Sequence, residues 1–177
     1  MANGIFIISE LEGSLRERVN AIQQRHDPKL AKSLPPHVTI TGSSGVGPIP
    51  SDVPVSRLRS ALEAITESTA PITTCFGPPM RFMQSNTVVL PLDPHGPLRT
   101  LHERIAKSGL AFTPARHFFT PHVTLSLYAT LTPEQVRELL RVRITEPVVI
   151  DRIQAYESNE PMPPIRLLEL KLTGGES

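Results

Sequence analysis

Two stretches of the chain, "PPHVTIT" at residues 35–41 and "TPHVTLS" at residues 120–126, are close copies of each other. Each runs proline, histidine, valine, threonine, then a branched aliphatic residue and a second hydroxyl side chain. Both stretches alternate polar with apolar residues and are rich in β-branched side chains, which is typical of a strand with one buried face. We therefore predict two equivalent β-strands, each with an apolar face for the core and a polar face.

The polar face of each strand carries a histidine and a threonine. Successive side chains of a strand point to opposite faces, so His37 and Thr39 lie on the same side. The same spacing places His122 and Thr124 together on the second strand. On a single strand such a face more often meets water than a ligand, but its repetition in register favours a shared role. We predict that the two strands face each other across an approximate two-fold axis, with both His-Thr pairs around one cleft.

The segments around each motif follow the same order: strand, helix, motif strand, helix, strand. The expected strands are 4–9, 35–41, 70–76, 86–92, 120–126, 146–158 and 165–173, and the expected helices are 11–26, 55–68, 96–109 and 132–141. The candidate caps are Ser56 and Thr132 at helix starts and Gly109 at a helix end. This pattern predicts a single bilobal domain over 1–177. Repeat one covers about 1–83 and carries "HVTI", repeat two covers about 84–177 and carries "HVTL", and an additional final strand pairs with the N-terminal half.

The composition excludes several classes of protein. The chain has 177 residues, with 18 basic and 17 acidic residues and a formal net charge of +1, so bulk charge does not suit it to long nucleic acids. Its one cysteine, Cys75, offers neither an internal disulfide nor a zinc cluster. The apolar run from Ile5 to Ile8 is too short for a signal peptide, and no segment approaches the roughly 20 apolar residues of a membrane span. We expect a cytoplasmic monomer.

Two histidines around one cleft suit acid-base chemistry at phosphorus. Histidine titrates near pH ~6.5, so one ring can act as a neutral base while the other acts as a protonated acid. One ring takes a proton from the attacking water or hydroxyl, and the other gives a proton to the leaving oxygen. The threonine hydroxyls can donate to the non-bridging phosphate oxygens. We expect neither a metal nor a cofactor.

The paired signatures "HVTI" and "HVTL", with the aromatic lead-in "FFTPHVTL", resemble the 2H phosphoesterase superfamily. Its members include the LigT-like 2′-5′ RNA ligase proteins and cyclic nucleotide phosphodiesterases. The resemblance implies an α+β fold, duplicated and pseudo-two-fold, with two antiparallel sheets around a central cleft and helices on the outside. It also implies that His37, Thr39, His122 and Thr124 are the catalytic residues. The implied activity is the opening of a 2′,3′-cyclic phosphate to a 2′-phosphate.

One segment departs from the pattern of the LigT-like members. These often carry an arginine shortly after the second motif, where this chain has "SLYATL". Small cyclic nucleotides are therefore candidate substrates beside RNA 3′ ends. Two alternatives stay open: 2′-5′ RNA ligase activity on tRNA halves, and a module that binds a nucleotide or RNA end without chemistry.

Weaker candidates for substrate contacts lie near the second motif and at the expected junction of the halves. They are Phe119, Tyr128, Arg116, Arg81 and Phe82. Phe119 could stack on a base or fill the core, and Tyr128 could contact substrate or lie at the rim. Arg116 could meet a phosphate or remain solvated. We expect His102 to be at the surface or half-buried, and Cys75 to be a buried strand residue.

Overall fold

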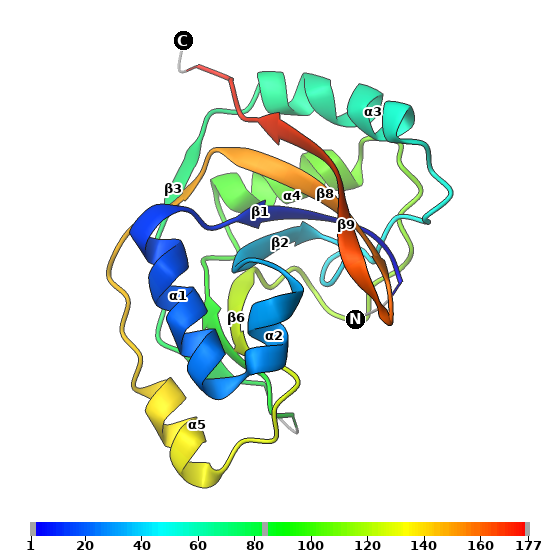
Figure 1. Cartoon of the computed structure of the whole chain (residues 1–177). Coiled ribbons are helices and arrows are strands. Elements are labelled where there is room, and N and C mark those ends of the chain that lie inside the picture. The colour runs from blue at the N-terminus through cyan, green and yellow to red at the C-terminus, as the bar shows by residue number, and fades with distance from the viewer. Residues whose placement is uncertain (1–2, 83–84, 176–177) are drawn as a thin grey trace.

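The computed structural model describes residues 3–82 and 85–175, which form an α+β fold of antiparallel sheets and surrounding helices (Figure 1). The helices are α1 (Gly13–His26), α2 (Pro28–Ser33), α3 (Val55–Glu67), α4 (Pro97–Ala106) and α5 (Pro133–Leu140). The strands are β1 (Gly4–Glu10), β2 (His37–Thr41), β3 (Ile72–Thr74), β4 (Met80–Arg81), β5 (Val88–Pro91), β6 (His122–Ser126), β7 (Val148–Ile150), β8 (Arg152–Asn159) and β9 (Met162–Lys171). The expected fold class is confirmed.

The strands form sheets in the orders β2-β1-β8-β9, β4-β5-β6 and β3-β7, and every pair is antiparallel. The expected strand 146–158 is two strands in different sheets, because β7 pairs with β3 and β8 pairs with β1. The final strand does not pair directly with the N-terminal half as expected: β8 pairs with β1, and β9 pairs with β8 at the sheet edge. Figure 1 shows this hairpin beside the N-terminal strand.

The two motif strands pair with their neighbours in the same way. β2 lies against β1 and β6 lies against β5, and both ladders shift register at the equivalent position. The equivalent pairs are Glu10–His37 with Pro91–His122, Ile8–Thr39 with Val89–Thr124, and Ile7–Thr41 with Val88–Ser126. Bulges of this kind bend and twist a strand locally, so both motifs have matching backbone geometry. The repeat boundaries near residue 83 stay a prediction.

The apolar faces of both motif strands lie in the core. Val38, Ile40, Val123 and Leu125 are fully buried and belong to one continuous cluster that extends from β1 to the C-terminal strands. β2 and β6 contact each other. The hydrophobic effect therefore fixes which way each strand faces, and the polar faces remain for a cleft.

The helix ends agree only partly with the sequence. Thr132 caps α5 in a full capping box with Gln135, as expected. Ser56 lies within α3, whose N-cap position is occupied by Pro54, so the prediction of a Ser56 cap is wrong. Helix α4 ends at Ala106 with Lys107 at its C-cap, which places Gly109 beyond the cap.

A short helix and the cysteine also differ from the expectations. Helix α2 forms in a segment that we expected to be a connection. Its N-cap is Asp27, and Pro28 occupies the first helical turn, where its missing N–H is not needed. Strand β3 ends at Thr74, and Cys75 beyond it is exposed and free rather than buried. Among the described residues, no helix is long and apolar enough to cross a bilayer.

Candidate active site

A cavity of about 330 Å³ contains all four residues that the motifs predict for the site. His37 and Thr39 reach it from β2, and His122 and Thr124 reach it from β6. All four side chains are half-buried. The two polar strand faces therefore share one cleft, as their duplicated sequence predicts.

The two imidazole rings are held by the same contact. Nδ1 of His37 lies 2.8 Å from the carbonyl oxygen of Pro35, and Nδ1 of His122 lies 2.7 Å from the carbonyl oxygen of Thr120. A carbonyl only accepts, so each Nδ1 must carry the proton and donate. Nε2 is then the atom of each ring that can take up or release a proton.

Burial lowers the pKa of both histidines. For His37 the hydrogen bond to the Pro35 carbonyl opposes this shift, the nearby His122 adds to it, and the Glu10 carboxylate opposes it. For His122 the Thr120 carbonyl opposes the effect of burial on the pKa. Both rings are therefore mainly neutral at pH 7, and the site favours a single proton shared between them over two imidazolium ions.

Glu10 is the strand partner of His37 and is fixed by its own hydrogen bonds. Its carboxylate accepts from the hydroxyl of Tyr156, and its main-chain N–H donates to Oε1 of Gln154 at 3.0 Å. Burial, with the hydrogen bond to Glu10, raises the pKa of Tyr156 to about 12. Tyr156 therefore keeps its proton and donates it, which holds the Glu10 carboxylate in place.

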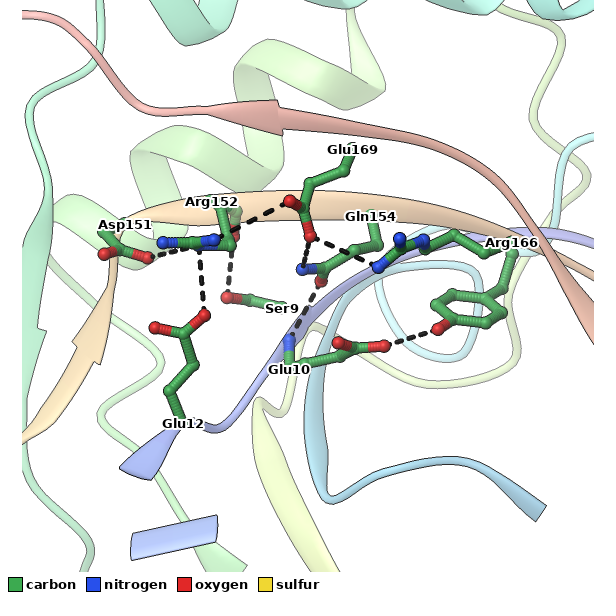
Figure 2. A network of polar contacts seen from close by, with 9 residues as sticks. Ser9, Glu10, Glu12, Asp151, Arg152, Gln154, Arg166 and Glu169 are labelled. Carbon is green, nitrogen blue, oxygen red and sulfur yellow. Dashed lines mark hydrogen bonds and ion pairs between the residues drawn. The ribbon is translucent and has the colours of Figure 1, made fainter. Parts of the chain in front are cut away.

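The network around Glu10 continues across β8 and β9. Figure 2 shows Arg152 reaching Glu12, Asp151 and Glu169, at 3.2, 3.0 and 3.6 Å. Glu169 also accepts from the side-chain amide of Gln154 at 2.9 Å. The polar side chains of three strands thus hold the end of β1 that carries Glu10.

Gln23, which the sequence did not single out, contacts the second motif from helix α1. Its Nε2 donates to the carbonyl oxygen of Thr124 at 2.9 Å. The side chain is buried and lines the cavity of the two histidines, and its Oε1 has no hydrogen-bond partner within the described part of the chain. Its four-residue spacing from Val19 on the buried stripe of α1 was the available signal.

Asp27, also missed, connects helix α2 to the segment after β6. Its Oδ1 accepts from the N–H of Leu30 at 3.2 Å. Its Oδ2 accepts from the N–H groups of Leu127, Tyr128 and Ala129 at 2.8, 2.7 and 3.3 Å. Burial raises the pKa of Asp27, but these hydrogen bonds outweigh it and the net pKa is lowered. The carboxylate is therefore a charged link between the two halves.

The Gly-rich loop after β2 is fastened to the lead-in of the second motif. Gly45 donates its N–H to the carbonyl oxygen of His117 at 2.8 Å, and Gly47 donates to Thr113 at 2.7 Å. Ser44 Oγ accepts from the N–H of Thr120 at 3.0 Å. These bonds join the two halves beside the cavity, so this loop is not a free connector.

Phe119 and His102 lie together in the interior. Their rings stack with centroids 4.0 Å apart and planes 14° from parallel. Phe119 is 5% exposed, which supports its core role over base stacking. His102 is also buried, and its Nδ1 lies 2.6 Å from the carbonyl oxygen of Ile40. The expectation of a surface or half-buried His102 is wrong, because this main-chain partner satisfies the ring.

The remaining weak candidates fall in different places. Phe82 lines the cavity of the two histidines and meets the His122 ring edge-on, with centroids 5.3 Å apart. Arg81 is exposed and donates to the Ser85 carbonyl. Arg116 lies at another cavity, and Tyr128 lies in an adjoining one. Among the described residues, no cluster of three or more His, Cys, Asp and Glu side chains is placed to hold a metal ion.

Comparison with known proteins gave one family and several related folds. The model of the 2′-5′ RNA ligase superfamily matches residues 11–161. The crystal structure of Escherichia coli LigT complexed with 3′-AMP superposes with a TM-score of 0.60 at 17% identity, covering 97% of this chain and 98% of that one. The crystal structure of a phosphoesterase superposes with a TM-score of 0.58 at 18% identity, covering 97% of this chain and 99% of that one. The crystal structure of a protein of Thermus thermophilus superposes with a TM-score of 0.59 at 16% identity, covering 97% of this chain and 99% of that one. A search of curated protein sequences gave no match.

Proposed function

The chain belongs to the 2′-5′ RNA ligase superfamily, and we propose that it is a phosphoesterase that hydrolyses 2′,3′-cyclic phosphates to 2′-phosphates without a metal. The resemblance to 2H phosphoesterases agrees with this family. The observation that carries the proposal is the placement of His37 and His122 in one cavity, with each Nδ1 held by the carbonyl two residues before it. This arrangement leaves two Nε2 atoms for proton transfer in a single site.

In the proposed reaction, the phosphorus of the cyclic ester lies between the two rings. His122 takes a proton from a water molecule as its oxygen forms a bond to phosphorus. The bond from phosphorus to O3′ breaks, and protonated His37 donates its proton to that oxygen, which leaves a 2′-phosphate. The hydroxyls of Thr39 and Thr124 donate to the non-bridging oxygens as charge accumulates there. Proton exchange with solvent then restores the starting state.

Glu10 supports the assignment of His37 as the acid. It is the strand partner of His37, and its charge raises the pKa of that ring against the larger effect of burial. The equivalent position opposite His122 is Pro91, which has no charge. The Glu10 charge thus favours a proton on His37, although burial and the nearby His122 lower the pKa of that ring more, and the assignment of His122 as the neutral base is part of the proposal.

The charge of the cavity suits a singly charged ester. Within the described residues that line it, the histidines are the only side chains that can be charged near neutral pH. A cyclic phosphodiester carries one negative charge, whereas its phosphomonoester product carries up to two. A site without a fixed cation holds the product weakly, which favours its release.

The same residues can also serve end joining, the activity named by the family. A ribose 5′-hydroxyl in place of water would lose its proton to His122 and form a 2′-5′ linkage, with O3′ leaving as before. This second candidate differs from the first only in the nucleophile.

The test is hydrolysis of adenosine 2′,3′-cyclic phosphate in EDTA, with the product identified by chromatography. We expect 2′-AMP, and we expect His37→Ala and His122→Ala each to lower kcat by about 10²- to 10⁴-fold. The matched control is His95→Ala, since His95 is exposed and lies outside the motifs. Turnover only with added metal would contradict the proposal. Binding without product would favour a non-catalytic module, and a 2′-5′ product from tRNA halves would favour end joining.

A further inference from the structure

A second cavity, of about 340 Å³, adjoins the catalytic cavity on the side of helix α2. Ser33 lines both cavities. A smaller hollow lined by His37, Ser158 and Pro164 lies between them, and Ser158 and Pro164 also line the second cavity. The shared lining residues place this second space next to the two histidines. We call it the lysine cavity, after Lys29 and Lys32 in its wall.

The lysine cavity carries the fixed positive charge that the catalytic cavity lacks. Lys29 and Lys32 are three positions apart on α2, which places them on the same face of the helix. Among the described residues that line the cavity, Glu160 is the one acidic side chain. Two ammonium groups against one carboxylate favour an anionic ligand.

An aromatic ring lies beside these charges. Tyr128 lines the lysine cavity, and Nζ of Lys29 lies 4.5 Å from the centre of its ring. Burial raises the pKa of the Tyr128 hydroxyl, and the charges of Glu160 and Asp27 raise it further, so the group stays neutral. A ring face next to an ammonium group matches a base or sugar next to a phosphate.

Asp27 fixes both walls of this cavity. Its carboxylate caps α2, the helix that carries the lysines, and accepts the main-chain N–H of Tyr128. The side chain of Asp27 is 1% exposed, so this link is shielded from water. The lysines and the aromatic ring are therefore held at a set separation before any ligand arrives.

We propose that the lysine cavity is a substrate subsite, in which Lys29 and Lys32 bind a second phosphate group of the molecule whose cyclic phosphate reacts at His37 and His122. The inference rests on the proposed function and deepens it. The described lining of the catalytic cavity holds no lysine or arginine to attract a phosphate ester, whereas the adjoining cavity holds two lysines. Each cavity exceeds ~300 Å³, the lower bound of typical small-molecule sites. The second phosphate can be a 5′-phosphate on the same nucleoside or the phosphodiester that joins it to a preceding nucleotide.

The test compares three substrates by kcat/KM at low salt: adenosine 2′,3′-cyclic phosphate, its 5′-phosphorylated form, and the dinucleotide ApA with a 2′,3′-cyclic end. We expect the wild-type protein to favour at least one of the two substrates with a second phosphate by about tenfold, the size of one charge-assisted contact. The double variant Lys29→Ala/Lys32→Ala should lose this preference and keep the rate with the simple nucleotide within about twofold. Lys107→Ala/Lys171→Ala, which removes two lysines outside both cavities, should behave as wild type.

A binding measurement separates this inference from the proposed reaction. By calorimetry, adenosine 2′,5′-bisphosphate should bind the wild type about tenfold more tightly than 2′-AMP, and the lysine double variant should bind both equally. Equal kcat/KM for all three substrates, or a preference retained in the double variant, overturns the subsite and leaves the proposed function intact. If no substrate is turned over, the proposed reaction fails, and the calorimetric comparison still decides the subsite. Preference for the 5′-phosphorylated nucleotide over ApA identifies a small-molecule substrate, and the reverse identifies an RNA end.

Discussion

Asp27 accepts a hydrogen bond from the main-chain N–H of Tyr128 at 2.7 Å, although 101 positions separate the two residues. The same carboxylate caps helix α2. A single buried charge therefore joins the helix after α1 to the segment that leaves the second motif strand. Its loss should affect the stability of the fold and the shape of the lysine cavity together.

The first prediction is that Asp27→Asn lowers the free energy of unfolding by about 2 kcal/mol, because hydrogen bonds to a charged group are stronger than those to a neutral amide. The amide also places an NH₂ group against main-chain N–H donors. Urea denaturation checks this, with an unchanged m value as the sign of a pure stability effect. Asp52→Asn, at an exposed loop position, is the matched control. An unchanged midpoint for Asp27→Asn would show that the contacts of this carboxylate contribute nothing net.

The second prediction is that Asp27 makes the free energy of unfolding depend on pH. Its pKa is lowered in the folded protein, so the ionised group contributes stability that is fully present above the ordinary aspartate pKa of about 3.9. That contribution is lost as the pH falls through the lower, folded-state pKa. The difference in unfolding free energy between wild type and Asp27→Asn should therefore narrow below about pH 4. A constant difference across that range would contradict the charged link.

A third prediction concerns the threonines. Thr39→Val and Thr124→Val keep the shape of the side chain and remove the hydroxyl, so each should lower kcat by about 10²-fold with little change in KM. Thr41→Val is a matched control on the same strand, because the Thr41 hydroxyl is buried without a hydrogen-bond partner in the described part of the protein. It should leave the rate unchanged. Normal rates in Thr39→Val and Thr124→Val would exclude the hydroxyls from transition-state stabilisation.

A fourth prediction concerns pH. Burial lowers the pKa of both His37 and His122, and in the proposed reaction kcat/KM reports the protonation states of the free enzyme. The alkaline limb of its pH profile, which marks loss of the proton from the acid, should lie below the ordinary histidine pKa of about 6.5. Glu10→Gln removes the charge that raises the His37 pKa, so this limb should move to still lower pH while the acidic limb stays. Glu17→Gln, at an exposed position on α1, should not move either limb. A shift of the acidic limb instead would exchange the assigned roles of the two histidines.

The fifth prediction concerns Gly45, in the loop that joins the two motifs. Its φ is +77°, and a Cβ atom there would clash with Nε2 of His102. Gly45→Ala should therefore displace the stacked His102 and Phe119 rings in addition to straining the backbone. Gly96→Ala is the matched control, since Gly96 has a φ of +75° and no atom within 4 Å of the added Cβ. We expect both variants to melt earlier than wild type, with a larger drop in Tm for Gly45→Ala. Equal drops in Tm for the two variants would mean that the loop shifts and relieves the clash without cost.

The motif strands could be predicted because each carries its signal locally. Alternation fixed the face of His37 and His122, and the matching flanks placed the two faces together. The strand alternation does not extend to Tyr128, because β6 ends at Ser126. The N–H groups that would continue the ladder are taken by Asp27. That competition comes from a residue 101 positions before Tyr128, and no local pattern reveals it.

Other features could not be predicted from the sequence for similar reasons. Helix α2 has six residues, which is too short for a helical period to emerge, although Asp-Pro at its start was a capping signal. His102 lies on an amphipathic helix, and its burial depends on the carbonyl of Ile40, 62 positions away. Long-range partners of this kind set the shape of the cavity. The histidines and threonines at its centre could be predicted from the alternation of the two motif strands alone.

The position of β8 beside β1 has a consequence for synthesis. Ile7 pairs with Ala155, so a strand that leaves the ribosome early must wait for one made much later before its sheet is complete. Pairings this distant in sequence slow folding. The apolar strand β1, with its Ile residues, stays without that neighbour during most of translation, and an unpaired apolar edge is prone to aggregation. Newly made chains should therefore be more vulnerable than finished ones, and truncation before β8 should yield insoluble protein.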